Sequence, residues 1–169
     1  MTRYTISVVI ASVLVSGAAL AASGVVSQTA KDVEGAWTLV SADDLRPNGT
    51  RNPLFGSNPV GLLIFLPDGT YSLQIKDSGQ AKFASGDRAK ATPDECQATV
   101  LANNPHWGKY TVNEADRTIT FQIEHAMFPN WEGTTQTRAF TLTGDQLKYT
   151  VPNATIAGAN PELVWKRAK

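Results

Sequence analysis

The feature that most constrains this chain is a two-residue alternation of apolar and polar side chains. It recurs in short runs separated by turn residues from Gly35 onward. Successive side chains of a β-strand point to opposite faces of a sheet, so each run predicts a strand with one buried face. In the clearest run, Tyr71, Leu73 and Ile75 alternate with polar residues. Because the chain shows no long helical periodicity and no internal repeat, we expect an all-β protein.

About eight such strands can be placed along the chain. The first starts near Trp37, and the others cover 61–66, 70–76, 109–112, 118–125, 135–142, 146–151 and 163–166. The run 61–66 is continuously apolar, which predicts a strand covered on both sides. Short turns such as Gly144-Asp145 join neighbouring strands in up-and-down order. A sheet of this size hides its apolar face by closing, so we expect an antiparallel β-barrel, with a two-sheet sandwich as the alternative.

One insertion, residues 77–105, is too long for a hairpin turn. Within it, Thr92 and Glu95 form a capping-box pattern around Pro93, which predicts a short helix from Pro93 to about Asn103. Such an excursion either lies as a lid across one mouth of the barrel or plugs it, and the sequence leaves both possibilities open.

The first residues have the pattern of an export signal. Arg3 is followed by an uncharged run of apolar and small residues, which ends in the small-x-small sequence Ala19-Leu20-Ala21. We therefore expect a cleaved signal peptide over 1–21, a flexible leader over 22–33, a barrel domain over 34–169, and a periplasmic or secreted location. An uncleaved anchor helix is the alternative.

Charge and composition argue against several partners. The chain has 15 Lys and Arg and 15 Asp and Glu, and this balance without basic clusters argues against nucleic acid. The only histidines, His106 and His125, lack metal-ligand spacing, and no cofactor fingerprint is present, so we expect no metal and no cofactor. After the signal, no segment is apolar enough to cross a membrane. The oligomeric state is left open.

The alternation predicts a barrel interior that is mostly apolar, with a few polar groups. This is the usual composition of a small-molecule pocket. Our candidate ligand-binding residues are Tyr71, Tyr110, His125, Trp131, Gln136, Arg138 and Tyr149.

Two of these candidates carry opposing interpretations. An arginine on an apolar face needs a partner, so Arg138 either anchors a carboxylate or carbonyl of a ligand, or stacks structurally on a tryptophan such as Trp37. His125, at the inward-facing end of its strand, is either a general base or a hydrogen-bonded residue of the barrel rim.

Several local motifs are distributed along the chain. The first predicted strand begins with a Gly-x-Trp pattern, Gly35-Ala36-Trp37. The other motifs are Asn58-Pro59-Val60-Gly61, Pro67-Asp68-Gly69-Thr70-Tyr71, Phe83-Ala84-Ser85-Gly86-Asp87-Arg88 and Phe128-Pro129-Asn130-Trp131-Glu132-Gly133, with Gln136 and Arg138 beyond. Together they resemble the lipocalin-like domain family of bacteria and fungi, and the resemblance spans nearly the whole chain after the signal. It implies a lipocalin-like barrel, but no shared reaction.

These observations predict an exported protein that binds a small, mainly apolar molecule inside its barrel. One alternative is a cofactor-independent isomerase or cyclase that uses tyrosines, His125 and Arg138 in the same cavity. Another is a structural barrel whose interior is filled by its own aromatic side chains. Whether the chain is an enzyme is left open.

Overall fold

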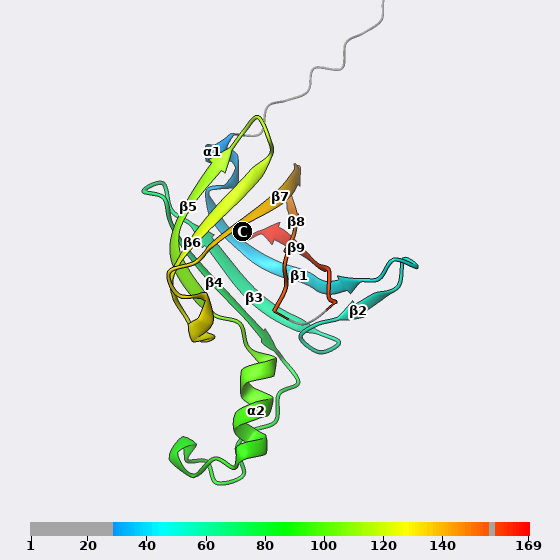
Figure 1. The fold of residues 1–169 in the computed structure, drawn as a ribbon, viewed down its shortest axis with the longest axis vertical. Helices are drawn as coiled ribbons and strands as arrows, with labels where there is room; N and C mark the ends of the chain where they lie inside the picture. The colour runs from blue at the N-terminus through cyan, green and yellow to red at the C-terminus, as the bar shows by residue number, and fades with distance from the viewer. Residues whose placement is uncertain (1–28, 156–157) are drawn as a thin grey trace, which may run out of the picture.

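The computed structural model describes residues 29–155 and 158–169 (Figure 1). Within them, an antiparallel sheet closes on itself, because β1 pairs with both β3 and β9. The strands are β1 (Gly35–Leu45), β2 (Arg51–Pro53), β3 (Pro59–Phe65), β4 (Thr70–Asp77), β5 (His106–Asn113), β6 (Thr118–Ala126), β7 (Thr135–Thr143), β8 (Gln146–Thr150) and β9 (Pro161–Arg167). Strands β1 and β3–β9 follow one another around an eight-stranded barrel, and β2 is an additional strand beside β1. The predicted all-β barrel is confirmed, and the sandwich is excluded.

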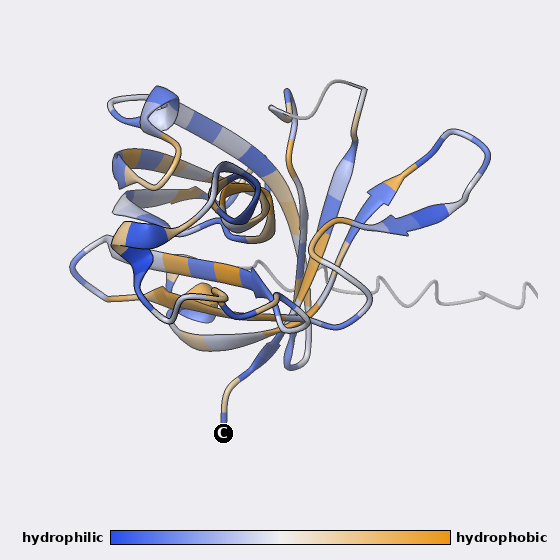
Figure 2. Ribbon diagram, turned by 90° about the horizontal axis from the view of Figure 1, so that it is seen from below, coloured by the Kyte–Doolittle hydropathy of each residue, from blue (hydrophilic) through white to orange (hydrophobic). Residues whose placement is uncertain are grey.

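The core lies inside the barrel and is built by the predicted alternation. Hydrophobic and hydrophilic residues follow each other along several strands in Figure 2. Fully buried aromatic side chains come from different strands, among them Trp37 of β1, Phe65 of β3, Phe121 of β6 and Trp165 of β9. The core therefore holds opposite walls of the barrel together.

Strand β3 differs from its prediction. Its continuous apolar run, 61–66, was expected to be covered on both faces, but Leu62 points outward and is 38% exposed, and Leu66, just after the strand, is 45% exposed. Leu63 and Phe65, on the inner face, are fully buried. The outer face of this strand thus stays exposed at Leu62, so an apolar run does not by itself imply two covered faces.

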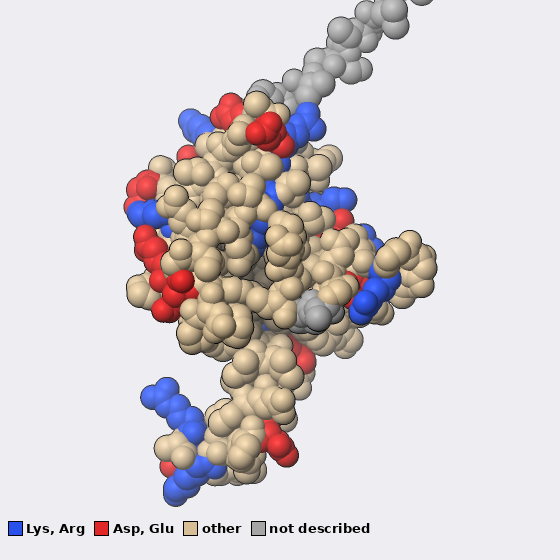
Figure 3. All heavy atoms as spheres, in the orientation of Figure 1, with Lys and Arg blue, Asp and Glu red and all other residues tan. Residues whose placement is uncertain are grey.

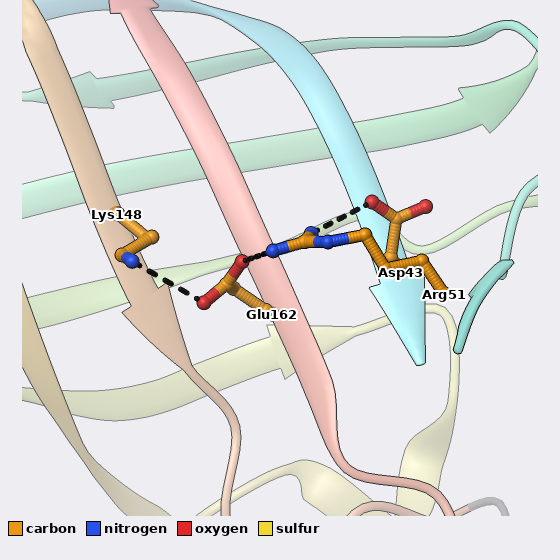
Figure 4. A network of polar contacts seen from close by, with 4 residues as sticks. All are labelled: Asp43, Arg51, Lys148 and Glu162. Atoms are coloured by element: carbon orange, nitrogen blue, oxygen red, sulfur yellow. Dashed lines mark hydrogen bonds and ion pairs between the residues drawn. The ribbon is translucent and has the colours of Figure 1, made fainter. Parts of the chain in front are cut away.

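Strand β2 was not predicted, because its three residues are exposed and show no alternation. Side-chain contacts fix it to the barrel (Figure 4). Arg51 donates to Asp43 of β1 at 3.2 Å and to Glu162 of β9 at 2.7 Å, and Lys148 of β8 lies 3.5 Å from the other oxygen of Glu162. This network links the extra strand to three strands of the barrel.

The predicted flexible leader over 22–33 is wrong for its last residues. Residues 30–33 form the short helix α1 (Ala30–Val33), and Val33 is fully buried. The Trp37 indole donates to the Val33 carbonyl at 2.8 Å, which holds this turn against the barrel end. The expected signal peptide, 1–21, and residues 22–28 of the leader lie outside the described residues.

The insertion between β4 and β5 projects away from the barrel (Figure 1). It contains η1 (Arg88–Lys90) and α2 (Pro93–Ala102), whose predicted capping box at Thr92 and Glu95 is present. Helix α2 has no buried residue, so it neither plugs the barrel nor packs across its mouth. Lys and Arg side chains gather at the far end of this excursion in Figure 3.

Candidate functional site

The centre of the candidate site is Arg138, which β7 directs into the barrel. The side chain is buried, with the residue only 3% exposed. Its guanidinium carbon lies 4.3 Å from the centre of the Phe121 ring and 5.1 Å from that of Tyr149. One terminal nitrogen, Nη2, donates to the amide oxygen of Gln136 at 2.8 Å. The alternation along β7 thus places a cation among aromatic rings.

Arg138 forms no ion pair with an Asp or Glu among the residues that the structure describes. A buried charge without a counter-charge costs several kcal/mol, whereas a cation–π contact returns about 0.5–2 kcal/mol. The rings and Gln136 therefore satisfy this side chain only in part.

A tyrosine–histidine pair lies beside this arginine. The Tyr71 hydroxyl and His106 Nδ1 are 2.8 Å apart, and both residues are 1% exposed. Burial, reinforced by the positive charge of Arg138, lowers the pKa of His106 to about 3, and burial raises the pKa of Tyr71. Both groups are consequently uncharged at neutral pH.

Four buried polar atoms in this region have no hydrogen-bond partner among the described residues: His106 Nε2, Arg138 Nε, the Tyr149 hydroxyl and Trp165 Nε1. Burial raises the pKa of the Tyr149 hydroxyl. Arg138 and Trp165 lie close enough to this hydroxyl to lower its pKa by a smaller amount. Neither contact has the geometry of a hydrogen bond. Because buried polar atoms are nearly always paired, this cluster can accept a ligand oxygen or water.

Half-buried residues place one end of the barrel beside the cluster. Trp131, in the short helix η2 (Pro129–Trp131), is half-buried and meets the His106 ring edge-on at 5.7 Å. Gln136, near the start of β7, and Val151, just after β8, are also half-buried. Since antiparallel β7 begins at the end where β8 stops, these residues mark one mouth.

Five of the seven predicted site residues are brought together here: Tyr71, Trp131, Gln136, Arg138 and Tyr149. Tyr110 is not among them. It is buried, but its hydroxyl donates to the Leu66 carbonyl at 3.0 Å beside the β3–β4 turn, and its ring packs on Phe65. Its hydrogen bond is therefore structural, and lies at the opposite end from the mouth.

The prediction that His125 faces inward is wrong. The side chain is 60% exposed, packs beside Trp107 on the outside and lies 3.6 Å from Glu132. The register shifts between Trp107 and Gly108, where Glu124 has no partner on β5, so this β-bulge reverses the alternation beyond Ile123. A side chain at Gly108 would collide with the backbone of Gln122 and Glu124, so the glycine makes the bulge possible.

Sequence reasoning missed His106 and Trp165 as candidate site residues. Extending the alternation backward from Tyr110 along β5 passes Gly108 and reaches His106 on the same face, but the strand was expected to begin only at Lys109. Trp165 follows Leu163 at the same two-residue interval on β9. Both signals are present in the sequence.

The structural interpretation of Arg138 also needs correction. The arginine over Trp37 is Arg167, with its guanidinium carbon 4.2 Å from the ring centre. Arg167 also donates to the carbonyls of Glu34 and Asp32 at 2.8 and 2.6 Å. This arginine closes the barrel end near α1, so stacking on that tryptophan does not account for Arg138.

A cavity of about 410 Å³ lies outside this cluster. It is formed between the outer side of β3 and β4, at Leu62 and Gln74, and the root of the excursion, at Asn103 and Pro105.

No group of three or more His, Cys, Asp or Glu in 29–155 and 158–169 is placed to hold a metal. In the same residues, no helix has the length and apolar character needed to cross a bilayer.

Comparison with known proteins supports the resemblance seen in the sequence. The family model described as a lipocalin-like domain matches residues 34–168. No curated protein matches the chain.

Proposed function

The chain belongs to the lipocalin-like domain family, and we propose that it binds a small, mainly apolar molecule inside its barrel. The observation that carries the proposal is the group of four buried polar atoms without partners around Arg138. A barrel built only for stability gains nothing from such atoms, because each costs about 1–3 kcal/mol when it is left unpaired. A bound molecule that pairs them explains why they are present.

The surroundings of the cluster support a mainly apolar ligand. Side chains that face inward around the polar atoms include Leu73, Ile75, Ile123 and Leu163, all of them buried. Pockets for small molecules combine such apolar walls with a few polar groups that orient the ligand. The ligand would therefore present one polar end to Arg138 and an apolar body to these walls.

Displacement of a neutral hydrophobic dye, N-phenyl-1-naphthylamine, tests the proposal. The dye should fluoresce in the presence of the purified chain and be displaced by components of a lipid extract. The variant Ile123→Trp, which adds bulk to the inner wall, should reduce dye binding, whereas Thr137→Trp on the outer face should not. Absence of displaceable binding would favour the filled structural barrel instead.

Export is the second part of the proposal, with a periplasmic or secreted location. It is supported by the sequence of residues 1–21, where Arg3 precedes an uncharged run that ends in Ala19-Leu20-Ala21. When the full chain is expressed in a bacterium, the periplasm or medium should contain a protein lacking residues 1–21 by mass spectrometry. Full-length chain retained in the cell membrane would instead indicate an anchor.

Catalysis of an isomerisation or cyclisation is a second candidate, and the Tyr71–His106 pair is the observation that favours it. His106 takes the place that His125 had in the sequence-based hypothesis. However, a pKa of about 3 makes His106 a weak base, so it would act by hydrogen bonding more than by proton removal. Mass spectrometry and chromatography of a bound polyene or ketone would show a product of unchanged mass if this candidate holds, and only starting material if the chain merely binds.

A further inference from the structure

We propose that the ligand ends in a carboxylate, which binds against Arg138, Tyr149 and Trp165. The inference rests on the proposed function and adds the chemical class of the ligand: an apolar monocarboxylic acid.

The first argument is the charge of Arg138. From β4, β5 and β8, this side chain faces Tyr71, His106 and Tyr149, none of which carries a charge at neutral pH. Glu124 of β6 acts on the pKa of Tyr71, but it is exposed and forms no ion pair with Arg138. Two carboxylates are also buried, but Asp44 is paired with Arg46, and Glu162 with Arg51 and Lys148. Among the described residues, Arg138 is thus the buried charge without a counter-charge, and a ligand with one negative charge balances it.

The second argument is the excess of donors over acceptors. The guanidinium and the Trp165 indole can only donate, and the amide oxygen of Gln136 is the one acceptor to which Arg138 is hydrogen-bonded among the described residues. A carboxylate only accepts, and its two oxygens have room for several donors. A neutral alcohol would add a further donor and leave the charge of Arg138 unbalanced.

The third argument is the position of the free atoms. The Tyr149 hydroxyl is close enough to Arg138 and Trp165 for both to lower its pKa, although neither contact has hydrogen-bond geometry. A single acceptor group placed at this hydroxyl can therefore reach all three side chains. Charge-assisted hydrogen bonds of this kind are about twice as strong as neutral ones.

The cluster also fixes the direction of the ligand. Arg138 is buried, whereas Gln136, two residues nearer the start of β7, is half-buried. The carboxylate would lie at the inner end of the site, and the apolar body would extend past Gln136 toward the mouth at Trp131 and Val151.

Paired probes test this inference: octanoate, decanoate, dodecanoate and tetradecanoate against the alcohols of equal chain length. Each is measured by displacement of N-phenyl-1-naphthylamine from the full chain. At least one acid should bind about tenfold or more tightly than its alcohol. In Arg138→Met, affinity for that acid should fall about 10- to 100-fold, as expected for a lost hydrogen bond to a charged group, with the alcohol little changed.

Two further variants keep the test decisive. Tyr149→Phe removes only a hydroxyl and should weaken the acid about two- to tenfold, even if Arg138→Met fails to fold. Arg167→Met removes the other ring-stacked arginine and should leave acid affinity at the wild-type value.

The possible negative results distinguish failure of the carboxylate assignment from failure of the proposed function. Acids and alcohols that bind equally well to the wild type overturn the carboxylate but leave the proposed function standing. If neither the dye nor any probe binds, both proposals fail, and the free atoms hold only water. An equal loss of acid affinity in Arg167→Met would overturn the assignment to Arg138.

Discussion

Two arginines in this barrel lie over aromatic rings, and they differ in what else their guanidinium groups contact. Arg167, over Trp37, donates to two backbone carbonyls and has Asp145 at 3.9 Å. Arg138, over Phe121 and Tyr149, has one amide oxygen, and its Nε has no partner. The first arrangement is complete without a ligand, whereas the second is not.

The difference divides the barrel into two regions. At the end near α1, Arg167 has hydrogen-bond partners and contributes to stability. In the interior around Arg138, buried polar atoms have no hydrogen-bond partner among the described residues. Natural proteins depart from full pairing mainly at functional sites, so the unsatisfied region is where we expect binding. If this division is correct, substitutions in the two regions should have different effects.

The largest effect is expected at the closed end. Trp37→Ala removes a fully buried ring that packs under Arg167 and donates to Val33, and it should lower the free energy of unfolding by about 3–5 kcal/mol. Urea unfolding measures the change. Trp107→Ala, at an outer site that is 48% exposed, is the control and should lose about 1 kcal/mol or less. Equal losses in both variants would contradict the assignment of stability to the closed end.

A pH effect should report on the interior. The pKa of His106 is about 3 in the folded chain and about 6.5 when unfolded, so between these values the unfolded state binds more protons. Stability should therefore fall on acidification, by about 2 kcal/mol between pH 7 and pH 5 from this residue alone. His106→Gln should flatten that part of the profile, and His125→Gln, at an exposed site, should not. If His125→Gln removed the slope, the burial of His106 would not be its cause.

Exchanging each arginine for methionine compares the two regions directly. Arg167→Met should lower the free energy of unfolding by about 1–2 kcal/mol, because its hydrogen bonds to two carbonyls are lost. Arg138→Met, measured without ligand, should stay within about 1 kcal/mol of the wild type or exceed it, since an unbalanced buried charge is removed. Methionine keeps much of the volume of the arginine stem, so cavity effects stay small. A large loss of stability in Arg138→Met alone would show that this arginine is structural.

The smallest effect is expected in the excursion, which belongs to neither region. Thr92→Ala removes the cap of α2 and should destabilise that helix by about 1 kcal/mol, as hydrogen exchange of its amides would show. Because α2 has no buried residue, the unfolding midpoint of the barrel and the dye affinity should be unchanged. A change in either would mean that the excursion contributes to the barrel or to its mouth.

Much of the fold could be predicted because it follows from local patterns. Alternation, together with the continuous apolar run at 61–66, identified the eight barrel strands, and Thr92 with Glu95 identified the start of α2. Strand β2 was not predicted because its residues show no alternation. The burial of Val33 was not predicted because a single buried residue produces no periodic pattern. The direction of the excursion could not be predicted, since it depends on how the ends of β4 and β5 leave the barrel.

The site was predictable in part for the same reason. The two-residue alternation predicted that Tyr71, Arg138 and Tyr149 face the interior, and the structure places them there. The same count failed at His125, because a bulge adds one residue to β6 and reverses every face beyond it. Partners across the barrel, such as Arg167 on Trp37, depend on strand pairing, which the sequence does not reveal by periodicity.

The central claim is that the unpaired atoms around Arg138 receive a ligand. A high-resolution crystal structure of the chain grown with decanoate tests it most directly. We predict a carboxylate within hydrogen-bonding distance of Arg138 Nε and the Tyr149 hydroxyl, with the alkyl chain directed toward Trp131 and Val151. Decanoate found only on the outer surface, with the interior closed by side chains that pair with one another or with water, would contradict the claim.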